Sequence, residues 1–204
     1  MSLTCPVDLD MLMLRREISA IYARVATAPD GPFHFHRGPA YAAGRLGYDA
    51  QELERLPADV TTRFAGVGNP HAIAPLPAGA TVVDVGCGGG MDLLLAALHV
   101  GPTGRAIGVD MTAQMREQAQ DGARALALTH VEVKDGDATQ LPVDDASVDA
   151  VISNGVLNLV PRKDRAIAEV ARVLKPGGHL QMADIVIGEE LPDSALRDID
   201  LWTG

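Results

Sequence analysis

The chain has 204 residues, of which 47% are hydrophobic and 22% are charged, and its formal net charge is −10 at pH 7. This length and composition predict a globular protein with one buried core, and the acidic balance excludes nucleic acid as a partner because a polyanion would be repelled. No apolar run approaches the roughly 20 residues of a membrane span, no signal peptide is visible, and the two cysteines exclude a disulfide framework and indicate the cytoplasm.

An amphipathic helix is expected near the N-terminus, between residues 8 and 26. Apolar side chains recur there at steps of three and four, and Asp8 or Asp10 is placed to cap the first turn. Such a helix either packs on the domain as a structural element or covers a cofactor as a lid, and the pattern fits both.

Residues 27–50 are rich in proline, glycine and alanine and are expected to form a loop. The loop contains Phe33-His34-Phe35-His36, whose two histidines can share one side of an extended segment. No third or fourth ligand lies near them in the sequence, so no metal site is expected. The segment is expected to pack as a loop, with an edge that faces the substrate as the alternative.

Residues 51–80 lead from this loop toward the first strand. Leu53 and Leu56 mark a short helix that ends near Pro57. A turn of glycine, asparagine and proline follows at residues 66–70, and we expect it to lie near the mouth of a cofactor site.

From residue 81 onward, apolar runs alternate with helical patterns. Strands are expected at 81–86, 105–109, 130–134, 148–153 and 179–186, and helices at 92–99, 113–127 and 162–174. Strands separated by helices connect through right-handed crossovers, which predicts a parallel sheet with helices on both faces. The fold class is therefore α/β: a Rossmann-like, doubly wound, mostly parallel sheet in residues 73–204, preceded by an extension of helices and loops in residues 1–72.

The first strand runs directly into a glycine turn and a helix, in the stretch Thr-Val-Val-Asp-Val-Gly-Cys-Gly-Gly-Gly-Met-Asp at residues 81–92. Gly86, Gly88 and Gly90 permit positive φ angles and let a ligand lie against bare backbone, next to the amides of a helix N-terminus. The second strand ends in Asp110, whose carboxylate can accept both hydroxyls of a ribose. Together the turn and the acid predict a nucleoside cofactor.

The glycine spacing argues against a dinucleotide, because the dinucleotide fingerprint needs its third glycine where this chain has Met91. Asp84 and Asp92 flank the turn, and their charges disfavour a pyrophosphate and suit a cofactor that carries an ammonium and a sulfonium. The turn resembles motif I of the class I S-adenosylmethionine methyltransferases, and Asp110-Met111 resembles their ribose–adenine motif. The alternatives are an NAD-linked oxidoreductase and a strand–turn–helix that binds no ligand.

The resemblance implies a role for each strand end. Asp110 holds the ribose diol, and Met111 forms an apolar wall for adenine. The Asp137 carboxylate and the Ala138 amide bind the adenine edge, while Asn154 and the glycine turn hold the amino-acid end. The residues expected to bind the cofactor are therefore Asp84, Gly86, Cys87, Gly88, Asp110, Met111, Asp137, Ala138 and Asn154. No catalytic residue is identified, because methyl transfer mainly needs alignment and exclusion of water.

Residues from about 48 to 203 are similar to the arsenite methyltransferase branch of this family, itself related to the ubiquinone-biosynthesis methyltransferases. The stretches specific to that branch are Gly-Asn-Pro at 68–70 and Asp-Met-Thr at 110–112. Arsenic enzymes of the branch hold As(III) with cysteine thiolates, which are soft ligands for a soft centre. Two of those cysteine positions are Val67 and Gly155 here, so arsenite methylation at the usual site is not expected.

The family sheet normally has seven strands, and the last two would follow residue 204. The expected sheet therefore lacks two strands, and its edge is either open in a shortened chain or covered by the partner protomer of a homodimer. The favoured function is methyl transfer from S-adenosylmethionine to a small molecule, with S-adenosylhomocysteine as the product. The rival is a pseudo-enzyme or interaction module that binds either compound without methyl transfer.

Overall fold

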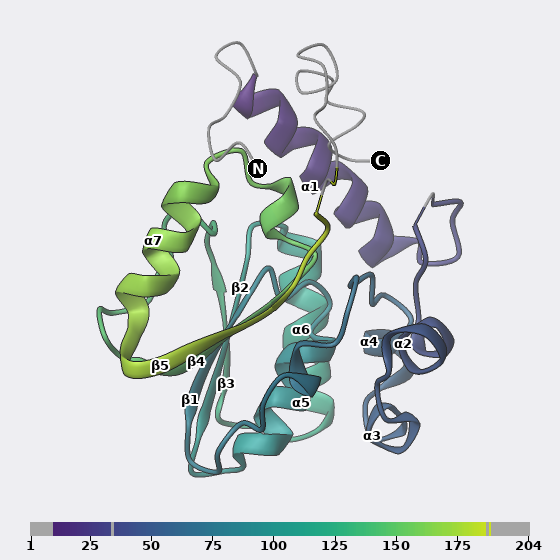
Figure 1. The fold of residues 1–204 in the computed structure, drawn as a ribbon. Helices are drawn as coiled ribbons and strands as arrows, with labels where there is room; N and C mark the ends of the chain where they lie inside the picture. The colour runs from purple at the N-terminus through teal and green to yellow at the C-terminus, as the bar shows by residue number, and fades with distance from the viewer. Residues whose placement is uncertain (1–9, 34, 187, 189–204) are drawn as a thin grey trace.

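The structure, a computed structural model, describes residues 10–33, 35–186 and 188. Five parallel strands form one sheet in the order β3-β2-β1-β4-β5 (Figure 1). The strands are β1 (Thr81–Val85), β2 (Arg105–Asp110), β3 (Val131–Asp135), β4 (Val148–Asn154) and β5 (Leu174–Ala183). The order reverses between β1 and β4, whose carboxyl ends therefore flank the switch point at which such sheets bind ligands. The predicted doubly wound α/β fold is confirmed.

Alternate residues of the central strand β1 contribute to different cores, because successive side chains of a strand point to opposite faces. Val82 packs on the side of α5 (Met91–Val100), whereas Val83 packs on the side of α7 (Lys163–Val173). Helix α6 (Ala113–Ala125) lies next to α5, and Figure 1 shows α7 on the other side of the sheet. Both faces are covered, as the alternation of strands and helices predicts.

The last strand differs most from its predicted extent. Leu174 already pairs with Val148, directly after α7 ends, and the ladder resumes only at His179, opposite Ala150. The Lys-Pro-Gly-Gly stretch between these two points therefore ends the helix, as predicted, and also interrupts the strand. β5 is the outer strand of the described sheet, where a proline without an N–H is tolerated.

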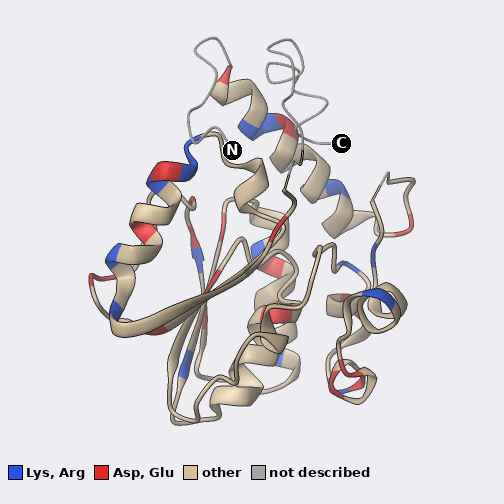
Figure 2. Ribbon diagram, viewed as in Figure 1, with Lys and Arg blue, Asp and Glu red and all other residues tan. Residues whose placement is uncertain are grey.

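Charged residues on the outer helices are arranged in local pairs. Figure 2 shows basic and acidic segments interspersed along α7. Arg172 of this helix pairs with Glu169 at 2.7 Å and with Asp145 at 2.6 Å, so it ties the end of α7 to the turn before β4. Within the described ranges, no helix is both long and apolar enough to cross a membrane.

The predicted N-terminal helix is present as α1 (Met11–Thr27). Asp10 caps it, because its carboxylate accepts the backbone amides of Leu12 at 3.0 Å and Met13 at 2.9 Å. Asp8, the other predicted cap, lies outside the described residues. The helix prediction and its Asp10 cap are confirmed.

The predicted loop at 27–50 is wrong in its second half, where α2 (Pro39–Leu46) forms. Pro39 stands in the first turn of this helix, and Gly47 ends it with a left-handed φ of 75°. Proline and glycine therefore mark the two ends of a helix here, not a loop. Ala42 is its buried residue, which explains why the apolar periodicity was weak. The remaining short helices are α3 (Ala50–Glu54), α4 (Ala58–Thr61) and the 3-10 turns η1 (Pro70–Ala72) and η2 (Leu157–Leu159).

The prediction of two missing strands concerns sequence after residue 204, and residues 189–204 lie outside the described ranges. The two-part division at residue 72 also stays a prediction.

Candidate functional site

The carboxyl ends of the strands open into one cavity of about 290 Å³. Its walls come from the turns after β1 and β3, the ends of β2 and β4, and α1, which lies across this end of the sheet (Figure 1). The volume is close to the ~300 Å³ at which ligand pockets usually begin. All nine residues expected to bind the cofactor line this cavity: Asp84, Gly86, Cys87, Gly88, Asp110, Met111, Asp137, Ala138 and Asn154. Their contacts with a cofactor stay a prediction.

The glycine turn needs its glycines for two different reasons. Gly86, Gly88 and Gly90 all have positive φ angles, of 71°, 51° and 94°. A Cβ on Gly90 would lie 2.9 Å from the Cβ of Ala119, so α6 packs directly on the backbone of the turn. A Cβ on Gly88 would meet nothing within 4 Å, so this residue presents open backbone at the cavity. One glycine permits packing, and another leaves room for a ligand.

Asp110 connects the end of β2 to the glycine turn. Its Oδ2 accepts the amide of Gly88 at 2.9 Å, and its Oδ1 accepts the amide of Thr112 at 2.8 Å. Burial raises the pKa of Asp110, although both amides and Arg116 act in the opposite direction. A carboxylate has about four acceptor positions, so the two amides leave acceptor capacity on each oxygen for a ligand.

Asp84 is the most unusual polar residue of the cavity. Its side chain is almost fully buried, at 2% exposure, and its Oδ2 has no hydrogen-bond partner. Burial, then the charges of Asp92 and Asp110, raise the pKa of Asp84 well above its ordinary value. An unpartnered buried carboxylate oxygen beside a cavity is costly unless a ligand donates to it. The site therefore suits a ligand with a cationic donor.

Asp137 and Cys87 line the cavity with side chains that are already constrained. Asp137 Oδ1 accepts the amide and hydroxyl of Thr139 at 2.6 and 2.5 Å, and its Oδ2 pairs with Arg15 of α1 at 2.8 Å. Burial, together with nearby carboxylates, raises the pKa of the Cys87 thiol well above its ordinary value. Cys87 is therefore held as a thiol and acts as a small apolar group of the turn.

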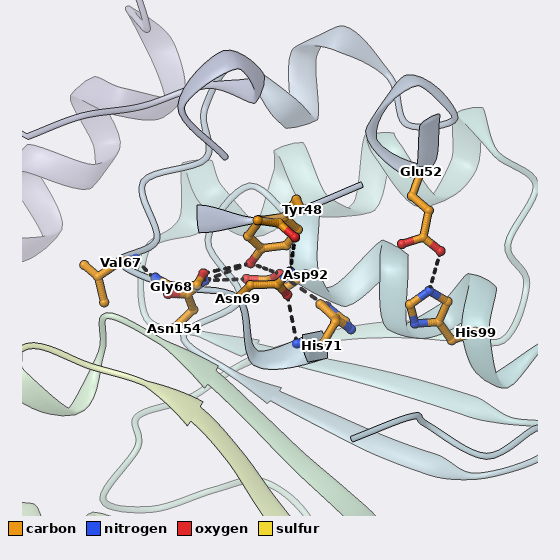
Figure 3. A network of polar contacts seen from close by, with 10 residues as sticks. Tyr48, Glu52, Val67, Gly68, Asn69, His71, Asp92, His99 and Asn154 are labelled. Carbon is orange, nitrogen blue, oxygen red and sulfur yellow. Dashed lines mark hydrogen bonds and ion pairs between the residues drawn. The ribbon is translucent and has the colours of Figure 1, made fainter. Parts of the chain in front are cut away.

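Asn154 lines the cavity, but its amide is fully occupied by protein groups (Figure 3). Its Oδ1 accepts the amides of Val67 at 2.8 Å and Gly68 at 3.2 Å. Its Nδ2 lies within donating distance of Tyr48 Oη at 3.0 Å, the Gly68 carbonyl at 2.8 Å and Asp92 at 3.0 Å. These hydrogen bonds connect the end of β4 to loop 65–69, Tyr48 and α5 at the cavity wall. The predicted contact of Asn154 with the cofactor stays a prediction.

The sequence left open whether α1 covers a cofactor as a lid or packs as a structural helix, and it identified none of the α1 residues that line the cavity. Tyr22 lines it, and burial and the charge of Asp110 raise the pKa of its hydroxyl to about 12. The other cavity residues on α1 are Met11, Leu14, Arg15 and Ile18. The signal was the apolar stripe itself, whose spacing gave a helix face but not the surface that it covers. The predicted turn at 66–70 reaches the cavity through Gly66.

The aromatic segment before α2 packs behind the cavity wall, where Phe35 stacks on Tyr22. Phe33 and Phe35 lie 5.5 Å apart between ring centroids and pack with Val25 and Met115. The packed loop that the sequence favoured is therefore present for these two residues. His34 lies outside the described residues.

Val67 and Gly155 lie against each other where loop 65–69 meets the end of β4. A Cβ on Gly155 would stand 3.2 Å from Cγ1 of Val67. The two positions at which the resemblance implies arsenic-binding cysteines are thus neighbours in space, and neither carries sulfur. Cys87 is the one cysteine among the described residues.

Comparison with known proteins gives a consistent relationship. Residues 76–202 match a family described as a methyltransferase domain. An arsenite methyltransferase from Halobacterium salinarum is 43% identical over 165 residues, which cover 81% of this chain and 42% of that protein. The chain thus spans less than half the length of this curated relative.

Two solved structures share the fold. An arsenic(III) S-adenosylmethionine methyltransferase from Chlamydomonas reinhardtii has a TM-score of 0.66 at 36% identity, over 71% of this chain and 51% of that one. The [4+2]-cyclase SpnF has a TM-score of 0.58 at 27% identity, over 87% of this chain and 60% of that one.

Proposed function

The chain belongs to the class I S-adenosylmethionine-dependent methyltransferases, in the arsenite methyltransferase-like branch, and we propose that it transfers the methyl group of S-adenosylmethionine to a small-molecule acceptor. The observation that carries this proposal is the link between Asp110 and Gly88. The carboxylate is fixed against the open backbone of the glycine turn and keeps acceptor capacity on both oxygens. A ribose diol needs two such acceptors, close to backbone that carries no side chain.

The residues of the cavity also fit the charge of this cofactor. Asp84 presents a buried oxygen without a partner, and Asp92 and Asp110 lie near enough to raise its pKa. An ammonium and a sulfonium would relieve the repulsion among these carboxylates, whereas the pyrophosphate of NAD would add to it. This asymmetry favours S-adenosylmethionine over a dinucleotide.

The adenine end of the cofactor would lie between β2 and β3. Met111 and Ala138 line this part of the cavity and supply apolar surface. Asp137 would accept from the adenine amino group, with its position fixed by Thr139 and Arg15. We propose that α1, within the extension of residues 1–72, closes the cavity over the cofactor.

When bound, S-adenosylmethionine supplies a methyl group on a sulfonium that needs no further activation. The protein's part is to orient an acceptor in line with that methyl group and to exclude water. Such orientation can contribute about 7–11 kcal/mol to lowering a barrier. The apolar face of α1, through Leu14 and Ile18, excludes water from one side of the cavity. A general base is optional for this reaction, and we assign none.

The acceptor is proposed to be a small molecule other than arsenite bound by thiolates. Val67 and Gly155 form an apolar contact at the two positions that matter for arsenic binding. Cys87 is buried in the glycine turn with a raised pKa, so it offers no thiolate. The sequence contains one further cysteine, Cys5, and one thiolate is a weak site for a soft trivalent centre.

A second candidate is a protein that binds the cofactor without transferring its methyl group. The absence of cysteine at positions 67 and 155 supports it, and the similarity to the [4+2]-cyclase SpnF indicates that the fold also occurs in a protein named for another reaction. This candidate predicts cofactor binding without turnover. We further propose a cytoplasmic location, in keeping with the two cysteines, and a homodimer that covers β5 stays a prediction.

Titration calorimetry with S-adenosylhomocysteine, with NAD as the control, tests the proposal. Micromolar affinity for S-adenosylhomocysteine and none for NAD is the expected result. Binding of NAD alone, or of neither compound, contradicts the proposal. A screen of small-molecule acceptors, read out as S-adenosylhomocysteine formed, then distinguishes transfer from binding without turnover.

A further inference from the structure

Four polar side chains meet in a buried cluster beside the glycine turn (Figure 3), and Asp92 lies at its centre. The Tyr48 hydroxyl donates to Asp92 Oδ1 at 2.7 Å, and Asn154 Nδ2 donates to Oδ2 at 3.0 Å. The imidazole Nε2 of His71 lies 3.2 Å from Oδ1. We call Tyr48, His71, Asp92 and Asn154 the Asp92 cluster.

The three partners of Asp92 come from separate parts of the chain. Tyr48 follows α2, His71 belongs to η1, and Asn154 ends β4. The ring of Tyr48 is itself held edge-on to Phe64, with 5.3 Å between centroids. Since both carboxylate oxygens have donors from the protein, the position of the Asp92 carboxylate is set before any ligand arrives.

Asp92 is also part of the cavity wall. It lies in the first turn of α5, two residues after Gly90, and is only 6% exposed. It lines the same cavity as Asp84 and the glycine turn. A carboxylate in the first turn of a helix is further stabilised by the partial positive charge of the helix N-terminus.

Asp84 and Asp92 are neighbouring carboxylates in opposite environments. Asp84 has an oxygen without a partner, and the charge of Asp92 contributes to raising its pKa. Asp92 has two hydrogen-bond donors and an imidazole around it. Asp92 is therefore the carboxyl group of the pair whose oxygens the protein itself holds in place by donors.

We propose that Asp92 is the carboxylate of the cofactor site that attracts the cationic amino-acid end of the cofactor, with Tyr48, His71 and Asn154 as the residues that position it. The inference rests on the proposed function and deepens it. It assigns the charge by which the site distinguishes a cationic cofactor from a neutral nucleoside, a role that the glycine turn alone cannot fill.

The titratable groups around Asp92 come from several elements. Burial and the charge of Asp92 raise the pKa of Tyr48 far above its ordinary value, so this hydroxyl keeps its proton and stays a donor. Asp84 is a neighbouring acidic group in the cavity, and Asp110 lines the same cavity. Glu52 is connected to the cluster only through His99, whose ring centroid lies 5.3 Å from that of His71.

The test uses two ligands that differ only at the amino-acid end. S-adenosylhomocysteine carries an ammonium and a carboxylate, whereas 5′-methylthioadenosine keeps the adenosine and the sulfur but lacks both charges. We expect Asp92→Asn to lower the affinity for S-adenosylhomocysteine by at least about tenfold, because a hydrogen bond to a charged group contributes a free energy of that size. The affinity for 5′-methylthioadenosine should stay within twofold of that of the wild-type protein (about 0.4 kcal/mol).

A second variant keeps the proposal testable if Asp92→Asn does not fold. Tyr48→Phe keeps the ring against Phe64 and removes only the donor, so it should show the same selective loss to a smaller extent. Tyr41→Phe is the matched control, because Tyr41 lies in α2 and stacks on His36, away from the cluster. Circular dichroism and thermal unfolding verify that each variant is folded.

Three outcomes decide the inference. A loss of affinity for S-adenosylhomocysteine, with the affinity for 5′-methylthioadenosine retained, supports it. An equal loss of both ligands shows that Asp92 is merely structural and overturns it, as does unchanged affinity for both in Asp92→Asn and Tyr48→Phe. If the wild-type protein binds neither ligand, the proposed function fails before the role of Asp92 is reached.

Discussion

Val67 and Gly155 are far apart in the sequence and in contact in the structure, where a Cβ on Gly155 would stand 3.2 Å from Cγ1 of Val67. The contact is held in place from both sides. Asn154 Oδ1 accepts the amide of Val67 at 2.8 Å, and the amide of Gly155 donates to the carbonyl of Ala183 at 2.8 Å. The side chain of Val67 thus packs beside Gly155, at the two positions where the resemblance implies cysteines.

Cysteines at both positions should create an arsenite site that the wild-type chain lacks. In Val67→Cys/Gly155→Cys, two sulfurs would approach each other closely enough to bind one soft trivalent ion. Gly155 has a φ of 70°, so the cysteine there should cost about 1–2 kcal/mol in stability. Arsenic retained after dialysis, measured by mass spectrometry, is the readout. Equal retention by the wild-type protein, or none by a folded double variant, would contradict this expectation.

Asp110→Ala should lower the affinity for S-adenosylhomocysteine by tenfold or more (at least about 1.4 kcal/mol). The change removes both the acceptors for a ribose diol and the hydrogen bond that holds the Gly88 amide. Calorimetric titration measures the effect. Asp121→Ala is the control, since Asp121 is exposed on α6 and pairs with Arg124. Equal affinities of Asp110→Ala and wild type would remove Asp110 from the site.

The strand-to-turn chemistry around Asp110 was predictable, because it is local in the sequence. A β-branched run, three glycines at alternate positions and an acid at the end of the next strand define both the parallel sheet and the ligand edge. The same local pattern located Asp137 directly after β3, and Gly86, Gly88, Asp110 and Asp137 all line the cavity.

The contacts between distant segments could not be predicted in the same way. Tyr48 lies in a stretch with no strong periodicity, yet its hydroxyl meets Asp92, which is 44 positions away. Asn154 was recognised as a strand-end residue, but its occupation by Val67 and Gly68 depends on the path of a glycine loop. Helix α2 was missed because its proline and glycine were interpreted as loop signals.

Cofactor affinity should rise with pH because of Asp84. Burial and the charge of Asp92 raise the pKa of Asp84, so the ligand-free protein holds a proton that the unfolded chain has already lost. Between the ordinary pKa of a carboxyl group and the raised pKa of Asp84, the folded state binds more protons than the unfolded state. The contribution of Asp84 to stability therefore falls as pH rises through this range. A cationic ligand favours the ionised form, and binding should therefore release a proton.

Asp84→Asn separates these two effects. At pH 8 the ligand-free variant should unfold at a higher temperature than the wild type, by about 2–4 °C for each kcal/mol of relieved charge burial. Its affinity for S-adenosylhomocysteine should be lower and should lose the dependence on pH. Calorimetry in two buffers of different ionisation enthalpy measures the proton release. A wild-type affinity that falls as pH rises would show that the sign is wrong.

The ion pair between Arg15 and Asp137 should contribute to holding α1 over the adenine end of the cavity. It spans 2.8 Å, but the Arg15 side chain is 50% exposed, and exposed pairs contribute at most about 1 kcal/mol. We therefore expect Arg15→Gln to lower the affinity for S-adenosylhomocysteine by about two- to fivefold at low salt. The difference should vanish at 1 M salt, where the screening length is about 3 Å. Arg16→Gln, the adjacent and exposed residue of the same helix, should bind like the wild type under both conditions. A loss that persists at high salt would assign Arg15 a packing role instead of an electrostatic one.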